Sequence, residues 1–135
     1  MKPLGPIPAG YAAIGGELAV GGLRASELVE KAGGTPAFVY SSGMIRACVE
    51  RLRVAMPERL SLHYAVKANP YTPILKLFNG LVDGFDIASG GELSMVLDAG
   101  VDPASVSFAG PGKRDAEIEA AIAAGKDVVS ANKAL

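Results

Sequence analysis

Short apolar runs and amphipathic stretches alternate along the chain from residue 60 onward. Apolar runs with few charges predict strands, and apolar residues three or four positions apart predict helices. In chain order the predicted elements are a strand over residues 60–66, a helix over 72–78, a strand over 82–88, a helix over 91–99, a strand over 105–109, a helix over 114–124 and a strand that starts at 127–130. Strand centres recur about every 22 residues, a spacing suited to strands joined by crossover helices. The pattern predicts an α/β fold, with a parallel sheet and helices outside it.

The first sixty residues have a weaker pattern. Residues 1–22 are rich in Gly, Pro and Ala and predict an irregular lead-in with at most one short strand. Residues 23–32 predict a short helix with Ser26 as a possible N-cap, which ends at Gly33-Gly34. Residues 37–40 predict a strand, and Ser42 caps a strong helix that ends before Pro57. Cys48 lies on the apolar face of that helix and is interpreted as a core residue.

Composition narrows the class of protein. The chain has 135 residues, of which 50% are hydrophobic and 20% charged, as in a globular protein. Its net charge of −1 argues against binding to nucleic acid or to an anionic membrane through bulk charge. One cysteine and one histidine exclude an internal disulfide and a Cys/His zinc cluster. We find no signal peptide and no apolar run of about 18 residues, so a cytoplasmic protein is expected.

Candidate chemistry lies at the predicted strand ends, where α/β proteins carry their working residues. Lys67 follows the apolar run His63-Tyr64-Ala65-Val66. Burying an ammonium is costly, so a lysine that ends such a strand is unusual. An unprotonated lysine amine is a good nucleophile and forms Schiff bases. The alternative is a lysine that only marks where the strand meets solvent.

The second strand end carries two carboxylates. Strand alternation places Asp86 on the face opposite Phe85 and Ile87, and an inward carboxylate needs a cationic partner, for which Lys67 is a plausible choice. Ser89-Gly90-Gly91 is a tight turn into a helix, and its free N–H groups make a ready anion site. Glu92 lies in the first turn of that helix, where it is either a functional carboxylate or a helix-capping residue. The Gly110-Pro111-Gly112 turn after the third strand permits close approach of a ligand but is a weak signal alone, and no dinucleotide fingerprint or P-loop occurs.

Two long motifs resemble one family. The motifs are His63-Tyr64-Ala65-Val66-Lys67-Ala68-Asn69-Pro70 and Val82-Asp83-Gly84-Phe85-Asp86-Ile87-Ala88-Ser89-Gly90-Gly91-Glu92-Leu93. In this order they resemble the N-terminal half of the fold-type III pyridoxal-phosphate-dependent amino-acid decarboxylases, the group of the diaminopimelate, ornithine and arginine enzymes. Residues 108–115 are most similar to the exosortase-associated branch. Pro70-Tyr71-Thr72-Pro73 stands where related alanine racemases have a Tyr-Gly-His-Gly stretch, which disfavours a racemase.

The resemblance implies a fold and a chemistry. The fold is the N-terminal half of a (β/α)₈ barrel, with a lead-in and short helix over residues 1–34 and a truncated barrel domain over 35–135. Lys67 is expected to form the internal aldimine with pyridoxal 5′-phosphate, with Asp86 and Glu92 as nearby cofactor-binding carboxylates. The implied reaction is decarboxylation of a basic or diamino amino acid, and the full-length family is expected to be homodimeric.

Two alternatives remain open at this point. One is a catalytically incompetent fragment, because the family's later cofactor-binding segments cannot be placed on this chain. The other is a protein that binds pyridoxal phosphate without turnover. The last residues, 128–135, depart from the family pattern and are locally similar to homoserine dehydrogenases, but no nucleotide fingerprint supports that activity.

Overall fold

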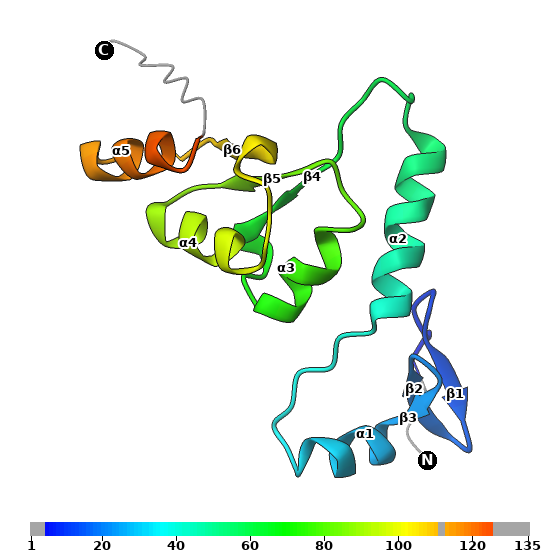
Figure 1. The fold of residues 1–135 in the computed structure, drawn as a ribbon. Coiled ribbons are helices and arrows are strands. Elements are labelled where there is room, and N and C mark those ends of the chain that lie inside the picture. The colour runs from blue at the N-terminus through cyan, green and yellow to red at the C-terminus, as the bar shows by residue number, and fades with distance from the viewer. Residues whose placement is uncertain (1–4, 111–112, 126–135) are drawn as a thin grey trace. The chain divides into compact units, whose positions relative to one another are not determined.

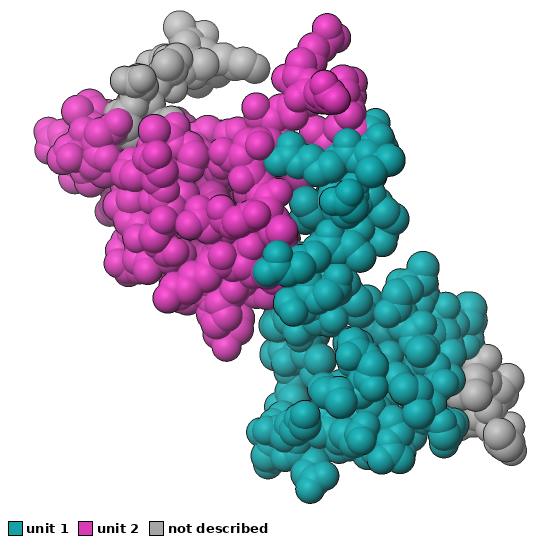
Figure 2. All heavy atoms as spheres, turned by 45° about the vertical axis from the view of Figure 1, so that its right-hand side comes forward, with its two compact units in different colours: residues 1–55 teal, residues 56–135 magenta. Residues whose placement is uncertain are grey.

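The computed structural model describes residues 5–110 and 113–125. The chain forms two compact units, residues 1–55 and 56–135, which Figure 2 distinguishes by colour. The predicted domain boundary between residues 34 and 35 stays a prediction, since compactness alone does not define a domain. No helix within the described ranges is long and apolar enough to cross a bilayer.

The first unit contains a small antiparallel sheet of β1 (Ala12–Ile14), β2 (Glu17–Val20) and β3 (Leu23–Arg24). The turns that join these strands are Gly15-Gly16 and Gly21-Gly22, and all four glycines have positive φ, as type I′ hairpin turns require. Our prediction of at most one short strand here was therefore wrong. Two Gly-Gly pairs between short apolar segments were the signal, because glycine enters this backbone region without a steric penalty.

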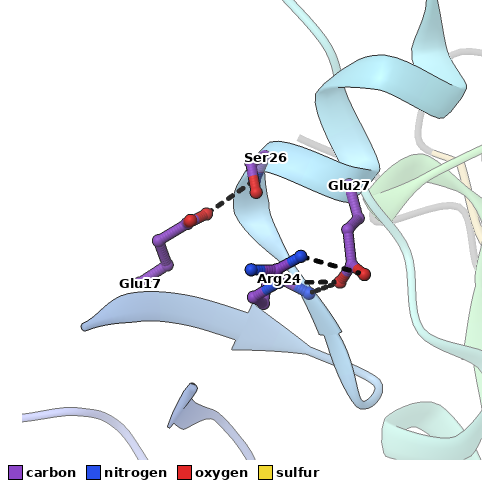
Figure 3. A network of polar contacts seen from close by, with 4 residues as sticks. All are labelled: Glu17, Arg24, Ser26 and Glu27. Atoms are coloured by element: carbon purple, nitrogen blue, oxygen red, sulfur yellow. Dashed lines mark hydrogen bonds and ion pairs between the residues drawn. The ribbon is translucent and has the colours of Figure 1, made fainter. Parts of the chain in front are cut away.

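Helix α1 (Ala25–Ala32) follows β3 directly and ends at Gly33, as predicted. Its N-cap is Arg24 rather than Ser26, because residues 23 and 24 are taken into β3. The Glu27 carboxylate accepts from the Arg24 backbone N–H at 2.8 Å, and Glu17 Oε2 accepts from the Ser26 N–H at 3.0 Å (Figure 3). The Ser26 side chain, followed by the Ser26 backbone N–H, lowers the pKa of Glu17, and the Arg24 backbone N–H lowers the pKa of Glu27. The two glutamates thus tie the sheet to the start of α1.

Helix α2 (Ser42–Ala55) confirms the predicted helix, but two details differ. Ser41, not Ser42, caps it, because Ser41 Oγ accepts from the Met44 N–H at 3.3 Å. Cys48 is exposed, so its assignment to the core was wrong. The buried position on α2 is the adjacent Val49.

Residues 37–40, predicted as a strand, have no regular structure. Apolar, β-branched and aromatic composition favours a strand, but a strand exists only when its backbone groups pair with another strand. None of the described strands pairs with this segment, and Phe38 is 89% exposed. The prediction for residues 37–40 is therefore wrong for this structure.

The second unit contains a parallel sheet of β4 (His63–Ala65), β5 (Gly84–Ile87) and β6 (Val106–Phe108), in that order. Helices α3 (Thr72–Phe78), α4 (Gly90–Asp98) and α5 (Asp115–Ala123) alternate with the strands, and α3 and α4 lie side by side (Figure 1). Short 3₁₀ turns occupy Val66–Ala68 and Pro103–Ser105. The predicted alternation of parallel strands and helices is confirmed, and the strand predicted from residue 127 lies outside the described residues.

One apolar cluster holds the second unit together. Strand alternation puts Phe85 and Ile87 into it, each 1% exposed, whereas Asp86 between them is only half-buried. This confirms the predicted faces of β5. The cluster consists of Val66, Leu75, Phe85, Ile87, Leu93, Val96, Ala99, Val101, Val106, Phe108 and Ala121.

Candidate functional site

Lys67 lies immediately after β4, in the 3₁₀ turn Val66–Ala68. Its neighbour Val66 is fully buried, whereas Lys67 itself is exposed. The carboxyl ends of parallel strands meet at one edge of a sheet. The turn therefore presents an accessible amine at the edge where β5 and β6 also end.

Asp86 lies at the same edge, one residue before the end of β5, in register with Ala65 on β4 and Ser107 on β6. Its Oδ1 accepts a hydrogen bond from Ser107 Oγ at 2.8 Å. No Lys67–Asp86 ion pair forms within the described residues, so the predicted partner was wrong in this structure. A half-buried carboxylate needs a donor, and the neighbouring serine hydroxyl supplies it.

Glu92 shows the capping arrangement that we considered as one alternative. Glu92 Oε2 accepts from the Ala88 N–H at 2.8 Å, and the Glu92 N–H donates to Ser89 Oγ at 3.2 Å. Serine at the N-cap with glutamate three residues later is the sequence of a capping box, but here the carboxylate accepts from Ala88 rather than from the N-cap residue Ser89. The contacts of Glu92 thus fix the backbone between the end of β5 and the start of α4, next to Asp86.

Glu117, on α5, is a residue of this region that the sequence did not indicate. Its Oε1 accepts from the Gly90 N–H at 2.8 Å and its Oε2 from the Arg114 N–H at 2.9 Å. These backbone hydrogen bonds lower the pKa of Glu117 from its ordinary 4.5 to about 2, and the bond from Arg114 has a larger effect than the bond from Gly90. The bond to Gly90 joins residues 27 positions apart, so no local pattern could reveal it.

The bond to Gly90 also changes the expectation for the Ser89-Gly90-Gly91 turn. We predicted a ready anion site from its free N–H groups. In the structure the Gly90 N–H binds Glu117 and the Glu92 N–H binds Ser89, so this helix start is occupied by the chain's own oxygen atoms. A carboxylate three residues into α5 takes the place that we expected an external anion to fill.

The turn after the third predicted strand, which begins at Gly110, allows the chain to pack closely against the end of β5. Gly110 is buried, and a side chain there would collide with the backbone of Ala88 at the end of β5. Lys113 Nζ donates to the Gly110 carbonyl at 3.0 Å and lies 5.2 Å from the centre of the Phe108 ring. Residues 111 and 112 lie outside the described residues. Gly110 therefore brings the ends of β5 and β6 together at the edge that carries Lys67.

Fold and site together define an α/β protein with an exposed amine and a hydrogen-bonded carboxylate at the carboxyl edge of its parallel sheet. Residues 42–135 match the family described as pyridoxal-dependent decarboxylase, pyridoxal binding domain. This chain belongs to that family. The predicted family and its cofactor, pyridoxal phosphate, are thereby confirmed, whereas the finer assignment to the exosortase-associated branch stays a prediction.

Known proteins agree with this assignment. A diaminopimelate decarboxylase of Neisseria meningitidis serogroup A is 50% identical over 93 residues, which are 68% of this chain and 23% of that protein. A crystal structure from Aquifex aeolicus superposes with a TM-score of 0.77 at 38% identity, over 87% of this chain and 28% of that one. Diaminopimelate decarboxylase from Helicobacter pylori, solved with L-lysine, has a TM-score of 0.67 at 34% identity, over 75% and 26%. The chain spans about a quarter of the length of these relatives, and the expected barrel fold is confirmed for that part.

Proposed function

We propose that this chain supplies the lysine-bearing part of a pyridoxal-phosphate-dependent amino-acid decarboxylase, with Lys67 as the residue that holds the cofactor. The observation that carries the proposal is the exposed Lys67 amine directly after β4, at the edge where Asp86 lies one residue before the end of β5. The residues fit the cofactor, because the exposed Lys67 amine would hold it covalently through its aldehyde group, with loss of water. When bound, the cofactor supplies an electron sink for loss of the substrate carboxylate.

The two carboxylates have separate roles in this proposal. Asp86, held by Ser107, contributes negative charge at the sheet edge that carries the lysine turn. Glu92 keeps the Ala88 N–H and the start of α4 in place, and would be a carboxylate near the bound cofactor. Both act from regular elements, which hold side chains more firmly than loops do.

For the whole protein we propose decarboxylation of a basic or diamino amino acid. The support is that the relative from Neisseria meningitidis is named diaminopimelate decarboxylase and that the Helicobacter pylori structure holds L-lysine. We also propose that the protein acts as a homodimer, which sedimentation of the whole protein would test. A cytoplasmic location stays a prediction.

Borohydride trapping tests the role of Lys67. The chain is incubated with pyridoxal phosphate, reduced with borohydride, digested and mapped by mass spectrometry. Lys67 is expected to be labelled well ahead of Lys76, an exposed lysine on α3 that serves as an internal control. Lys67→Ala is expected to lose this label and keep the slow label on Lys76. Labelling of Lys67 no faster than Lys76 overturns the proposal.

A further inference from the structure

The backbone around Lys67 is held at both ends. On one side, fully buried Val66 anchors the turn in the apolar cluster. On the other side, Asn69 closes the turn, because its N–H donates to the Val66 carbonyl at 3.1 Å. Because the residues on both sides of Lys67 are fixed, the backbone position of Lys67 is fixed as well, although its side-chain amine is free to move.

Tyr64 connects this turn to the core. Its hydroxyl donates to the Asn69 carbonyl at 3.1 Å, and so spans from β4 to the residue beyond the turn. Its ring stacks on Phe78 of α3, with centroids 3.9 Å apart and planes 16° from parallel. It also meets Phe85 of β5 edge-on, at 6.0 Å and 79°. One side chain therefore joins the lysine turn to a neighbouring helix and a neighbouring strand.

The connection continues into α3. Asn69 Oδ1 accepts from the Tyr71 N–H at 3.0 Å, and Tyr71 is the N-cap of α3. The same helix carries Phe78, the residue on which Tyr64 stacks. Strand, turn and helix thus form a closed loop of contacts around Lys67, and the Tyr64 hydroxyl is the link across the turn.

We propose that Tyr64 is a positioning residue for Lys67: its hydroxyl holds the 3₁₀ turn in the conformation from which the amine reacts with a carbonyl cofactor. The inference rests on the proposed function, because it assigns Tyr64 a role in the covalent step at Lys67. Tyr64 itself touches no reacting atom in this scheme. Displacement of a reacting group by about 1 Å can slow a reaction by about a hundredfold, so a loosened turn is expected to show as a slower attachment rate.

The test is the Tyr64→Phe variant, which removes the hydroxyl and retains both ring contacts. The rate constant for labelling of Lys67 by pyridoxal phosphate is measured by quenching with borohydride at successive times. We expect at least a tenfold decrease at Lys67 and no change at Lys76. We also expect faster amide hydrogen exchange at Asn69 and an unchanged far-ultraviolet circular dichroism spectrum. Tyr11→Phe, an exposed tyrosine of the first unit, is the matched control and leaves both rates unchanged.

The outcomes separate the two proposals. If wild-type Lys67 is not labelled ahead of Lys76, the proposed function fails. If wild-type Lys67 is labelled first and Tyr64→Phe reacts at the same rate, the function stands and the positioning role is refuted. Should Tyr64→Phe not fold, Phe78→Leu decides, because loss of the ring on which Tyr64 stacks loosens the Tyr64 hydroxyl from the Asn69 carbonyl. Faster hydrogen exchange at Asn69 with a selective slowing at Lys67 supports the role, and an unchanged rate at Lys67 overturns it.

Discussion

Glu117 Oε1 accepts a hydrogen bond from the Gly90 backbone N–H at 2.8 Å, which joins the first turn of α5 to the first turn of α4. The other carboxylate oxygen of Glu117 accepts from Arg114 at 2.9 Å. This one side chain satisfies N–H groups at the start of two helices, groups that have no partner within a helix. The relationship leads to a prediction about pH.

The Glu117→Gln variant is expected to alter the dependence of stability on pH. The folded-state pKa of Glu117, about 2, lies below its ordinary 4.5. The carboxylate therefore stabilises the fold above about pH 4.5, and this stabilisation is lost as the pH falls toward 2. Urea unfolding of both proteins at successive pH values should give a stability difference that is largest near neutral pH and shrinks below 4.5. Glu119→Gln, exposed on the same helix, is the control. A pH-independent difference would contradict the assignment.

Ser107→Ala is expected to destabilise the second unit by about 1 kcal/mol, the usual net contribution of a hydrogen bond. The reason is that Asp86 Oδ1 loses the Ser107 hydroxyl, which lies at 2.8 Å. The measurement is the free energy of unfolding in urea at neutral pH. Ser94→Ala, an exposed serine on α4, makes the same chemical change outside this contact. Equal effects of the two substitutions would show that the Asp86–Ser107 bond does not stabilise the fold.

Phe85→Ala is expected to destabilise the second unit by about 3–5 kcal/mol, because it leaves a cavity in the apolar cluster. Phe38→Ala removes the same atoms from a side chain that is 89% exposed, whereas Phe85 is 1% exposed. The Phe38→Ala substitution should change the free energy of unfolding by less than about 0.5 kcal/mol. Thermal and urea unfolding of the two variants measure the difference. Similar losses at both positions would contradict the assignment of the core.

Gly110→Ala is expected to destabilise the fold by about 1–3 kcal/mol, as overpacking does. The new methyl group would collide with the backbone of Ala88, which can move only if β5 and β6 separate. Gly80→Ala is the matched control, because a side chain at Gly80 meets nothing within 4 Å. We expect the Gly110 variant also to label Lys67 more slowly, since it disturbs the same edge of the sheet. A neutral Gly110→Ala would mean that the two strand ends are not in close contact.

The regular part of the fold was readable from the sequence because its signals are local. The helix predicted over residues 72–78 coincides with α3, and each of β4, β5 and β6 lies inside its predicted strand. The observed strands are shorter than predicted. Apolar residues extend beyond the hydrogen-bonded ladder, since residues such as Val66 contribute to the core from a turn.

The wrong predictions concern segments whose structure depends on hydrogen bonding to another segment of the chain. Residues 37–40 have the composition of a strand but no pairing strand in the structure described here. The N-terminal sheet was missed because its strands are only two to four residues long, too short for alternation to show. In both cases the deciding quantity is hydrogen bonding to another segment, which composition does not report.

For the site, too, some features were predictable from the sequence and others were not. The periodicity predicted that Lys67, Asp86 and Glu92 lie near strand ends, and the structure places all three at one edge of the sheet. The periodicity did not predict the hydrogen-bond partners at this edge. Ser107 is 21 residues from Asp86, and Glu117 is 27 from Gly90, so these contacts are set by strand register and helix placement. Residue types indicated the chemistry, whereas three-dimensional pairing decided which groups satisfy one another.

The even spacing of these contacts has a consequence for how the second unit assembles. The Leu62 N–H binds the Asp83 carboxylate and Ser107 binds Asp86, each across 21 residues, and the Glu117–Gly90 bond spans 27. Each step of assembly therefore closes a loop of nearly the same length and meets a similar entropic barrier. Parallel pairing across such separations forms more slowly than contacts within a helix, so addition of each new strand to the edge left by the one before is expected to limit the folding rate.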